Sequence, residues 1–177
     1  MTHKEIIQSL AIYNQKTNVT LISVLEPHHQ RWEEETGSYF KTLKGLLNHL
    51  IAGDTNWLRR WADFGFVDAT TAKAIADIPL NAGNEWKFES WEQFKELRYI
   101  LDQLFVGFTE SISDKRLDEQ FVYGWQWGKT KIAFGISLLH VFNHQAHHRG
   151  AISQILDAMG IQNDYSGFSK HFSEKVE

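Results

Sequence analysis

The stretch LLHVFNHQAHHRGAI, residues 138–152, collects four histidines among leucine, isoleucine and phenylalanine. His140, His144 and His148 are spaced four residues apart, so on an α-helix they stack along one face. His147 lies off that row. The stretch therefore predicts a helix that buries its apolar residues against other helices and presents a row of imidazoles to one of them.

Three earlier segments repeat apolar side chains every three or four residues, which indicates amphipathic helices. They are residues 4–25, residues 39–62 and the segment that follows the capping-box sequence SWEQ at 90–93. The helix that contains the quoted stretch is expected to run from Thr130 to Met159, with Gly160 just beyond its end.

Two connections interrupt this helical pattern. Residues 64–89 contain Pro79 and several glycines and asparagines, which predicts a long crossover with a short helical turn near residues 70–75. The segment EQFVYGWQWGKTKIAF, residues 119–134, alternates aromatic residues with glycine breaks, which predicts a short β-ribbon or extended loop.

These elements together predict the fold class. Four long helices, with a long connection between the second and third and a ribbon before the fourth, favour an all-α four-helix bundle. A less regular all-α domain is the alternative. We expect one domain that covers residues 1–177. Gly45 and Gly53 lie inside the second helix, where each costs about 1 kcal/mol relative to alanine, so close packing is the expected reason for them.

The composition excludes several kinds of site. The chain has no cysteine, so a metal must be held by histidine, carboxylate or water, and any reactive thiol must come from a substrate. A net charge of −4 without a basic patch argues against nucleic-acid binding. No apolar run reaches the roughly 18 residues of a membrane span, and the start does not look like a signal peptide, so we expect a cytoplasmic protein.

Geometry limits which histidines can share one metal ion. Zinc–nitrogen bonds of about 2.0–2.1 Å place two ligand nitrogens about 3–3.5 Å apart. Residues eight apart on a helix are separated by roughly 12 Å, which is too far. The spacing therefore favours either His140 with His144 or His144 with His148, and His144 with His147 is a weaker pair. His49 is the expected third ligand from a facing helix, and ordinary core or surface histidines are the alternative.

The segment HVFNHQAHHRG, together with LLNHLIAGDTNWLRR in the second helix, resembles the DinB family, within the DinB/YfiT-like superfamily of metal-dependent helical proteins. The resemblance covers nearly the whole chain. It implies that His49, His144 and His148 bind one divalent metal ion. Imidazole suits several metals, so zinc is the first expectation, and nickel, iron, manganese and copper are alternatives. Ala151 departs from the family, whose members often carry glutamine there.

The resemblance also gives roles to neighbouring residues. His140 becomes a structural residue one turn from the ligands, with a catalytic role as the alternative. His147 is expected to face another helix or solvent, with contact to a substrate as the alternative. Asp54 is either the carboxylate that orients a ligand histidine or a charge on the helix surface. Arg149 is expected on a solvated or ion-paired face, with an anionic substrate as the alternative partner.

The resemblance implies a metal-dependent transferase or isomerase that uses a low-molecular-weight thiol and a second small-molecule substrate. A hydrolase that activates water is equally permitted by the chemistry. The alternative is a stress-response protein that binds a metal or ligand without turnover. An open fourth coordination position favours the enzyme, whereas a fourth protein ligand favours the binding protein. Relatives are often dimers, so the resemblance also implies a homodimer.

Overall fold

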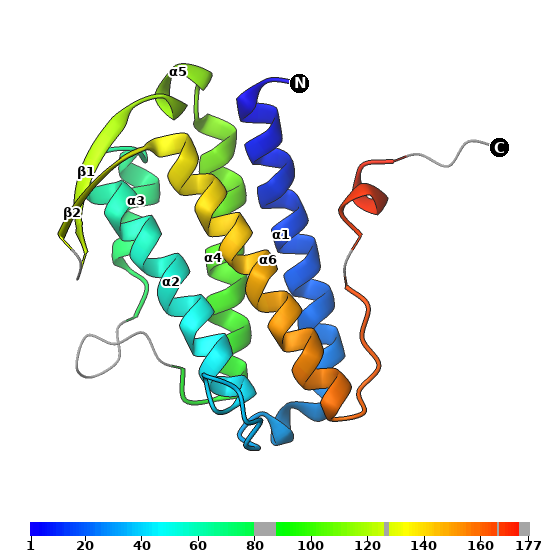
Figure 1. The fold of residues 1–177 in the computed structure, drawn as a ribbon. Helices are drawn as coiled ribbons and strands as arrows, with labels where there is room; N and C mark the ends of the chain where they lie inside the picture. Colours follow the sequence, from blue (N-terminus) through cyan, green and yellow to red (C-terminus); the bar gives the residue numbers. More distant parts are fainter. Residues whose placement is uncertain (80–87, 126–127, 166, 174–177) are drawn as a thin grey trace.

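A computed structural model describes residues 1–79, 88–125, 128–165 and 167–173. Four long helices lie side by side along the length of the molecule (Figure 1). They are α1 (His3–Leu25), α2 (Leu43–Asp63), α4 (Trp91–Ser111) and α6 (Phe134–Ala158). Helix α1 packs against α4 and α6, and α2 packs against α6 and α4.

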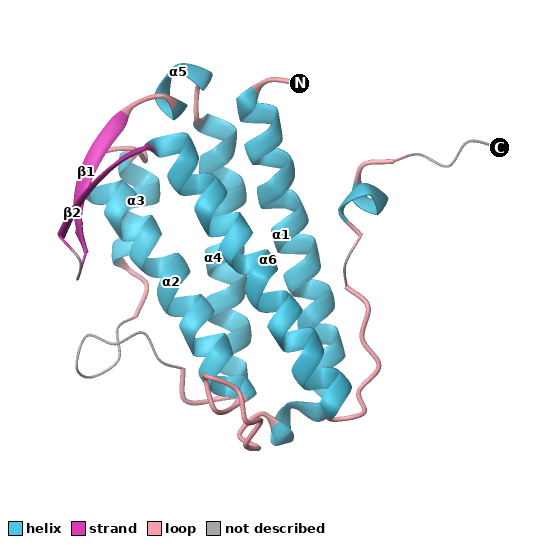
Figure 2. Ribbon diagram, viewed as in Figure 1, coloured by secondary structure: helices cyan, strands magenta, loops and turns pink. Residues whose placement is uncertain are grey.

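Short elements connect these helices (Figure 2). They are the 3₁₀ helix η1 (Glu26–Arg31), the helices α3 (Ala69–Ala76) and α5 (Asp114–Leu117), and the strands β1 (Gln120–Trp125) and β2 (Gly128–Ala133). A second 3₁₀ helix, η2 (Phe168–His171), follows α6. The prediction of a mostly helical protein with a small ribbon is confirmed. The predicted helical turn in the crossover corresponds to α3, while residues 80–87 lie outside the described part of the chain.

The second helix begins later than predicted, at Leu43 rather than residue 39. The Thr42 hydroxyl accepts a hydrogen bond from the Gly45 amide at 3.0 Å and caps the helix there. Residues 36–42 instead form a tight loop, in which the Thr36 amide donates to the Lys41 carbonyl at 2.7 Å. Lys41 has a φ of 65°, which a non-glycine residue rarely adopts.

The fourth long helix also begins later than predicted, because the expected start at Thr130 is wrong. Residues 128–133 form β2, which pairs with β1 in antiparallel register from Gln120 opposite Ala133 to Trp125 opposite Gly128. Helix α6 follows directly at Phe134. Its end agrees with the prediction, since Gly160 has a φ of 71° just after the last turn.

The capping box predicted before α4 is only half present. The Ser90 hydroxyl accepts from the Gln93 amide at 3.2 Å, as expected. The Gln93 side chain accepts from the amide of Glu89 at 2.7 Å rather than from that of Ser90. The cap therefore still satisfies an amide at the start of α4 and also ties down the residue that precedes it.

The interior between the long helices is apolar towards both ends and polar in the middle. Trp61, Phe105 and Phe134 are fully buried and their rings are in contact. Burial of one such side chain contributes on the order of 2–3 kcal/mol. The buried polar residues near the middle are Asn14, Asn18, Asp54, Arg98, Asp102, Gln145 and Arg149. Within the described residues, none of the helices has the length and apolar character needed to cross a membrane.

Candidate metal centre

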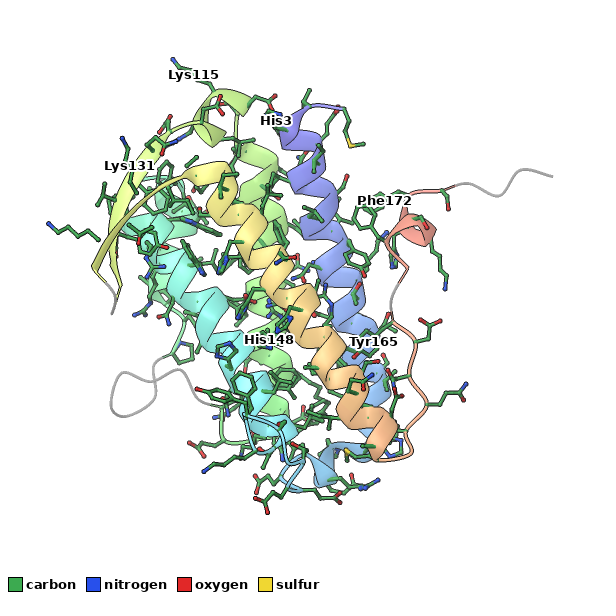
Figure 3. The ribbon with its side chains drawn as sticks, viewed as in Figure 1. His3, Lys115, Lys131, His148, Tyr165 and Phe172 are labelled. Carbon is green, nitrogen blue, oxygen red and sulfur yellow. The ribbon has the colours of Figure 1, made fainter. Side chains whose placement is uncertain are left out.

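Three imidazoles meet where α2 and α6 face each other. His49 comes from α2, and His144 and His148 come from successive turns of α6. The Nε2 atom of His144 lies 3.0 Å from the Nε2 atom of His49 and 3.0 Å from that of His148. His148 is labelled in Figure 3, where it lies beside α2. The structure therefore brings together the one histidine of α2 and one of the two pairs that spacing alone favoured on α6.

The three nitrogens form a donor set that fits a divalent cation. They lie within 4.8 Å of one another, and nitrogens bound to zinc in a tetrahedral site are about 3.3 Å apart. In a neutral imidazole, Nε2 carries either one proton or one lone pair. One such atom is poorly suited to hydrogen-bond two neighbouring Nε2 atoms, whereas a cation can accept a lone pair from all three.

The electrostatic setting keeps these imidazoles neutral. Burial, together with the nearby His49, lowers the pKa of His144 to about 4. Burial also lowers the pKa of His148 to about 4, with His144 as the next cause. The pKa of His49 is lowered by burial as well, although the negative charge of Asp54 opposes that shift. At neutral pH all three rings are therefore uncharged, and their lone pairs are free for a metal.

Two glycines of α2 allow other groups to approach this cluster. A Cβ atom on Gly53 would lie 3.4 Å from Cε1 of His144, so the small residue leaves room for that ring. A Cβ atom on Gly45 would lie 2.4 Å from the carbonyl oxygen of Phe40, which no ordinary packing allows. The close packing predicted for these glycines is confirmed at Gly45, whereas at Gly53 a Cβ atom would make only ordinary contact.

The loop before α2 covers one side of the imidazoles. The ring of Phe40 has its centroid 4.7 Å from that of His49 and 5.4 Å from that of His148. Because Gly45 has no Cβ atom, the Phe40 carbonyl can lie against the first turn of α2, which brings this aromatic cover close to the start of the helix. The cover shields the cluster from water on that side.

A groove of about 620 Å³ opens beside the cluster, between this loop and the C-terminal half of α6. His147, His148 and Ala151 line it from the helix, and Phe40 lines it from the loop. Its other lining residues are Arg31, Glu34, Glu35, Thr36, Gly37, Ser38, Tyr39, Leu46, Gln154, Ile155, Ala158 and Met159. Ala151 therefore belongs to the wall of the groove.

His140 and His147 lie next to the cluster without joining it. The ring centroid of His140 is 5.9 Å from that of His144, and it also contacts Trp57 at 5.4 Å. His140 is exposed, so it is not a core residue. His147 is exposed too, with its ring centroid 4.9 Å from that of His148.

Asp54 and Arg149 are buried, which corrects the expectation that either lies on a solvated face. Asp54 is 1% exposed and Arg149 is 4% exposed. The Asp54 carboxylate accepts from Nη1 of Arg98 at 2.5 Å and from the amide of Gln145. Asp54 thus bonds to neighbouring polar side chains rather than to a ring nitrogen of the cluster. Charged residues become acceptable in the core when they find such partners.

Sequence reasoning missed the residues that pair with Asp54 and Arg149. A signal was present, because three long helices carry polar pairs four residues apart on faces that are otherwise apolar. These pairs are Asn14 with Asn18, Arg98 with Asp102, and Gln145 with Arg149. Such pairs place two polar groups on one helix face and indicate polar partners in the core.

The sequence model of the DinB family matches residues 1–165 of the 177. The chain belongs to the DinB family. The match ends at Tyr165, whose hydroxyl donates to the Arg149 carbonyl at 2.7 Å, and it therefore includes all four long helices. No curated protein and no solved structure matches the chain. Family membership and the histidine cluster together agree with a DinB-like protein that can hold a divalent metal ion.

Proposed function

We propose that this DinB-family protein is a metal-dependent enzyme that activates a small-molecule thiol or water at a three-histidine site. The observation that carries the proposal is the convergence of the Nε2 atoms of His49, His144 and His148 beside an open groove. Among the described residues, the group has no fourth histidine, aspartate or glutamate. A site with three protein ligands leaves a coordination position for a substrate, as catalytic metal sites do.

The roles of the residues follow from their positions. His49, His144 and His148 would hold the ion, and their low pKa values keep them available as ligands at neutral pH. When bound, a divalent ion supplies Lewis acidity, which lowers the pKa of a thiol or water ligand. Phe40 excludes water on one side, and the groove holds the organic part of a substrate.

The absence of cysteine bears on the choice of nucleophile. The chain has no thiol of its own, so a thiol nucleophile would belong to a low-molecular-weight cosubstrate. A thiol-dependent transferase therefore suits the site, and a hydrolase remains the alternative because the same groups can activate water. Zinc is the first choice of ion, with nickel, iron, manganese or copper as alternatives, because imidazole binds all of these.

The proposal includes the wider setting of the site. We assign α1, α2, α4 and α6 to a four-helix bundle, which is supported by their mutual packing. We further propose that the protein works in the cytoplasm as a homodimer, on small molecules rather than on nucleic acid or membranes. Its net charge of −4 and the lack of a basic run support the exclusion of nucleic acid.

Metal analysis of protein purified without an affinity tag tests the site. We expect about one divalent ion per chain, because three histidines of one cluster can serve a single ion. His144→Ala should abolish metal binding, because Nε2 of His144 lies within contact of Nε2 of both His49 and His148. His147→Ala is the matched control and should retain the ion. An unchanged metal content in the His144 variant would refute the assignment.

Turnover is tested separately from binding. Small thiols are mixed with electrophilic acceptors, and consumption of the thiol is measured with the metal-loaded protein, the metal-free protein and His144→Ala. We expect consumption only with the loaded wild-type protein. Metal-dependent release of acid from ester substrates, without thiol consumption, would instead favour the hydrolase. A loaded protein that is inert in both assays would favour binding without turnover.

A further inference from the structure

A chain of buried polar side chains begins and ends on α6, directly beside the two imidazoles of that helix. Gln145 follows His144 in sequence, and Arg149 follows His148. Gln145 is fully buried and Arg149 is 4% exposed. We call the connected residues the polar circuit, which consists of Gln145, Asp54, Arg98, Asp102, Asn18, Asn14 and Arg149.

The first half of the polar circuit joins α6 to α2 and then to α4. The side-chain amide of Gln145 donates to Oδ2 of Asp54, which lies one and a half turns after His49 on α2. The same oxygen accepts from Nη1 of Arg98 on α4 at 2.5 Å. Gln145 therefore links the two helices that carry the imidazoles, at the level of the imidazoles.

The second half returns from α4 through α1 to α6. Nη2 of Arg98 lies 2.9 Å from Oδ1 of Asp102. The carboxylate of Asp102 accepts from the side-chain amide of Asn18 at 3.0 Å. The amide of Asn14 also reaches Asp102, at 3.5 Å, and its oxygen accepts from Nη1 of Arg149 at 2.5 Å. The polar circuit thus contacts all four long helices.

Stability alone does not account for such an arrangement. Buried ion pairs often contribute less than apolar residues of the same volume, because both charges lose their hydration. What a connected buried network does provide is a single allowed arrangement, since sliding one helix along another would leave charges and amides without partners. The polar circuit therefore fixes how far each helix is shifted along its neighbours.

The geometry of a three-histidine site depends on how far the helices that carry the ligands are shifted along each other. Ligands must be held within about 0.5 Å of their productive positions. His49 belongs to a different helix from His144 and His148, so its distance to them is set by the placement of α2 against α6. Besides the contact between His49 and His144 themselves, a further side-chain hydrogen bond between these two helices joins Trp61 to Ser137 at 2.9 Å, about two turns away from His144.

We propose that Gln145 is a positioning residue for the metal site. Its bond to Asp54 holds α2 and α6 in the relative placement that lets the three imidazoles share one ion. The inference rests on the proposed function, because it presumes that the cluster binds a metal. It goes further by assigning a role in metal affinity to a side chain that donates to Asp54 and is not part of the imidazole cluster.

The test measures binding of Co²⁺ and Zn²⁺ to the full chain, with the visible absorption spectrum of Co²⁺ as a report of coordination geometry. Gln145→Met keeps the volume and removes the donor to Asp54. We expect a dissociation constant raised about 10- to 100-fold, the usual effect of removing a side chain that supports a metal ligand. The Co²⁺ spectrum should change as well, while the metal-free protein keeps its helical circular dichroism.

Ser137→Ala is the matched control. It removes a buried hydrogen bond between the same two helices, because the Ser137 hydroxyl accepts from Nε1 of Trp61. We expect it to lower thermal stability and to leave both the affinity and the Co²⁺ spectrum unchanged. If Gln145→Met does not fold, Gln145→Asn shortens the same side chain by one methylene and serves in its place.

The outcomes separate the two proposals. A wild-type protein that binds neither ion overturns the metal site and the positioning role together. A wild type that binds, with a Gln145 variant of equal affinity and spectrum, overturns the positioning role alone. Equal weakening by the Gln145 and Ser137 variants also overturns it, because any loosening between α2 and α6 would then have the same effect.

Discussion

At the scale of single residues, histidine spacing predicted the candidate ligand pairs on α6 but could not choose between them. The position of His49 on the facing helix α2 favours His148 over His140 as the second ligand on α6. In the structure, Nε2 of His49 and Nε2 of His148 both contact Nε2 of His144. Spacing could not make this choice, since both candidate pairs are four residues apart. Arg149 was misplaced for a related reason. Whether a charged residue is buried depends on partners such as Asn14, which belongs to another helix.

Gly53 gives a prediction at this scale. A Cβ atom there would make ordinary contact with the His144 ring at 3.4 Å, so Gly53→Ala should be tolerated. Alanine in a helix is favoured over glycine by about 1 kcal/mol, which raises the melting temperature of a chain of this size by about 2–4 °C. Gly53→Val adds methyl groups that must displace the ring. We expect that variant to lose metal affinity in a titration, whereas equal affinities for both variants would contradict the packing role.

At the scale of elements, local patterns located the long helices but misplaced two of their starts. Residues 130–133 fall both in the ribbon predicted over residues 119–134 and in the helix predicted from Thr130, and their pairing with residues 120–123 makes them a strand. Residues 39–42 were included in the second helix because Phe40 fits its apolar period. The Thr42 cap and the loop that places Phe40 over His49 override that pattern. The contact of Phe40 with His49 depends on the folded loop and is not visible in a short window of sequence, whereas the Thr42 cap is a local signal.

Gly45 gives the prediction for this loop. Gly45→Ala places a Cβ atom 2.4 Å from the Phe40 carbonyl oxygen, so the loop or the first turn of α2 must move. Overpacking of this kind costs about 1–3 kcal/mol, which outweighs the better helix propensity of alanine. The melting temperature should therefore fall, in contrast to Gly53→Ala on the same helix. A rise in melting temperature would show that the loop does not depend on this close approach.

At the scale of the whole molecule, sequence patterns predicted a mostly helical protein and did not predict its polar interior. The apolar stripes of the helices describe where the core lies, and they treat polar residues as surface. Asn18 and Asp102 break that expectation, because each satisfies the other within the core. The four long helices are therefore held by two kinds of contact, apolar packing towards both ends and hydrogen bonds in the middle.

Metal binding should stabilise this whole arrangement, since the ion would join α2 to α6. A ligand that binds only the folded state, at 100 times its dissociation constant, contributes about 2.7 kcal/mol. We expect a rise in melting temperature of about 5–10 °C when Zn²⁺ is added to metal-free protein. His144→Ala should show no rise. An equal rise in that variant would mean that the ion acts elsewhere on the chain.

The choice of three imidazoles, rather than carboxylates, has a consequence for the charge of the occupied site. The ligands are uncharged, and the nearby carboxylates of Asp54 and Asp102 face the guanidinium of Arg98, with that of Arg149 close by. A divalent ion would then keep its full double positive charge inside a protein whose formal charge is −4. Attraction of that kind is strong where water is excluded. The site would thus discriminate among small molecules by charge before it does so by shape, with a preference for anions at the fourth position.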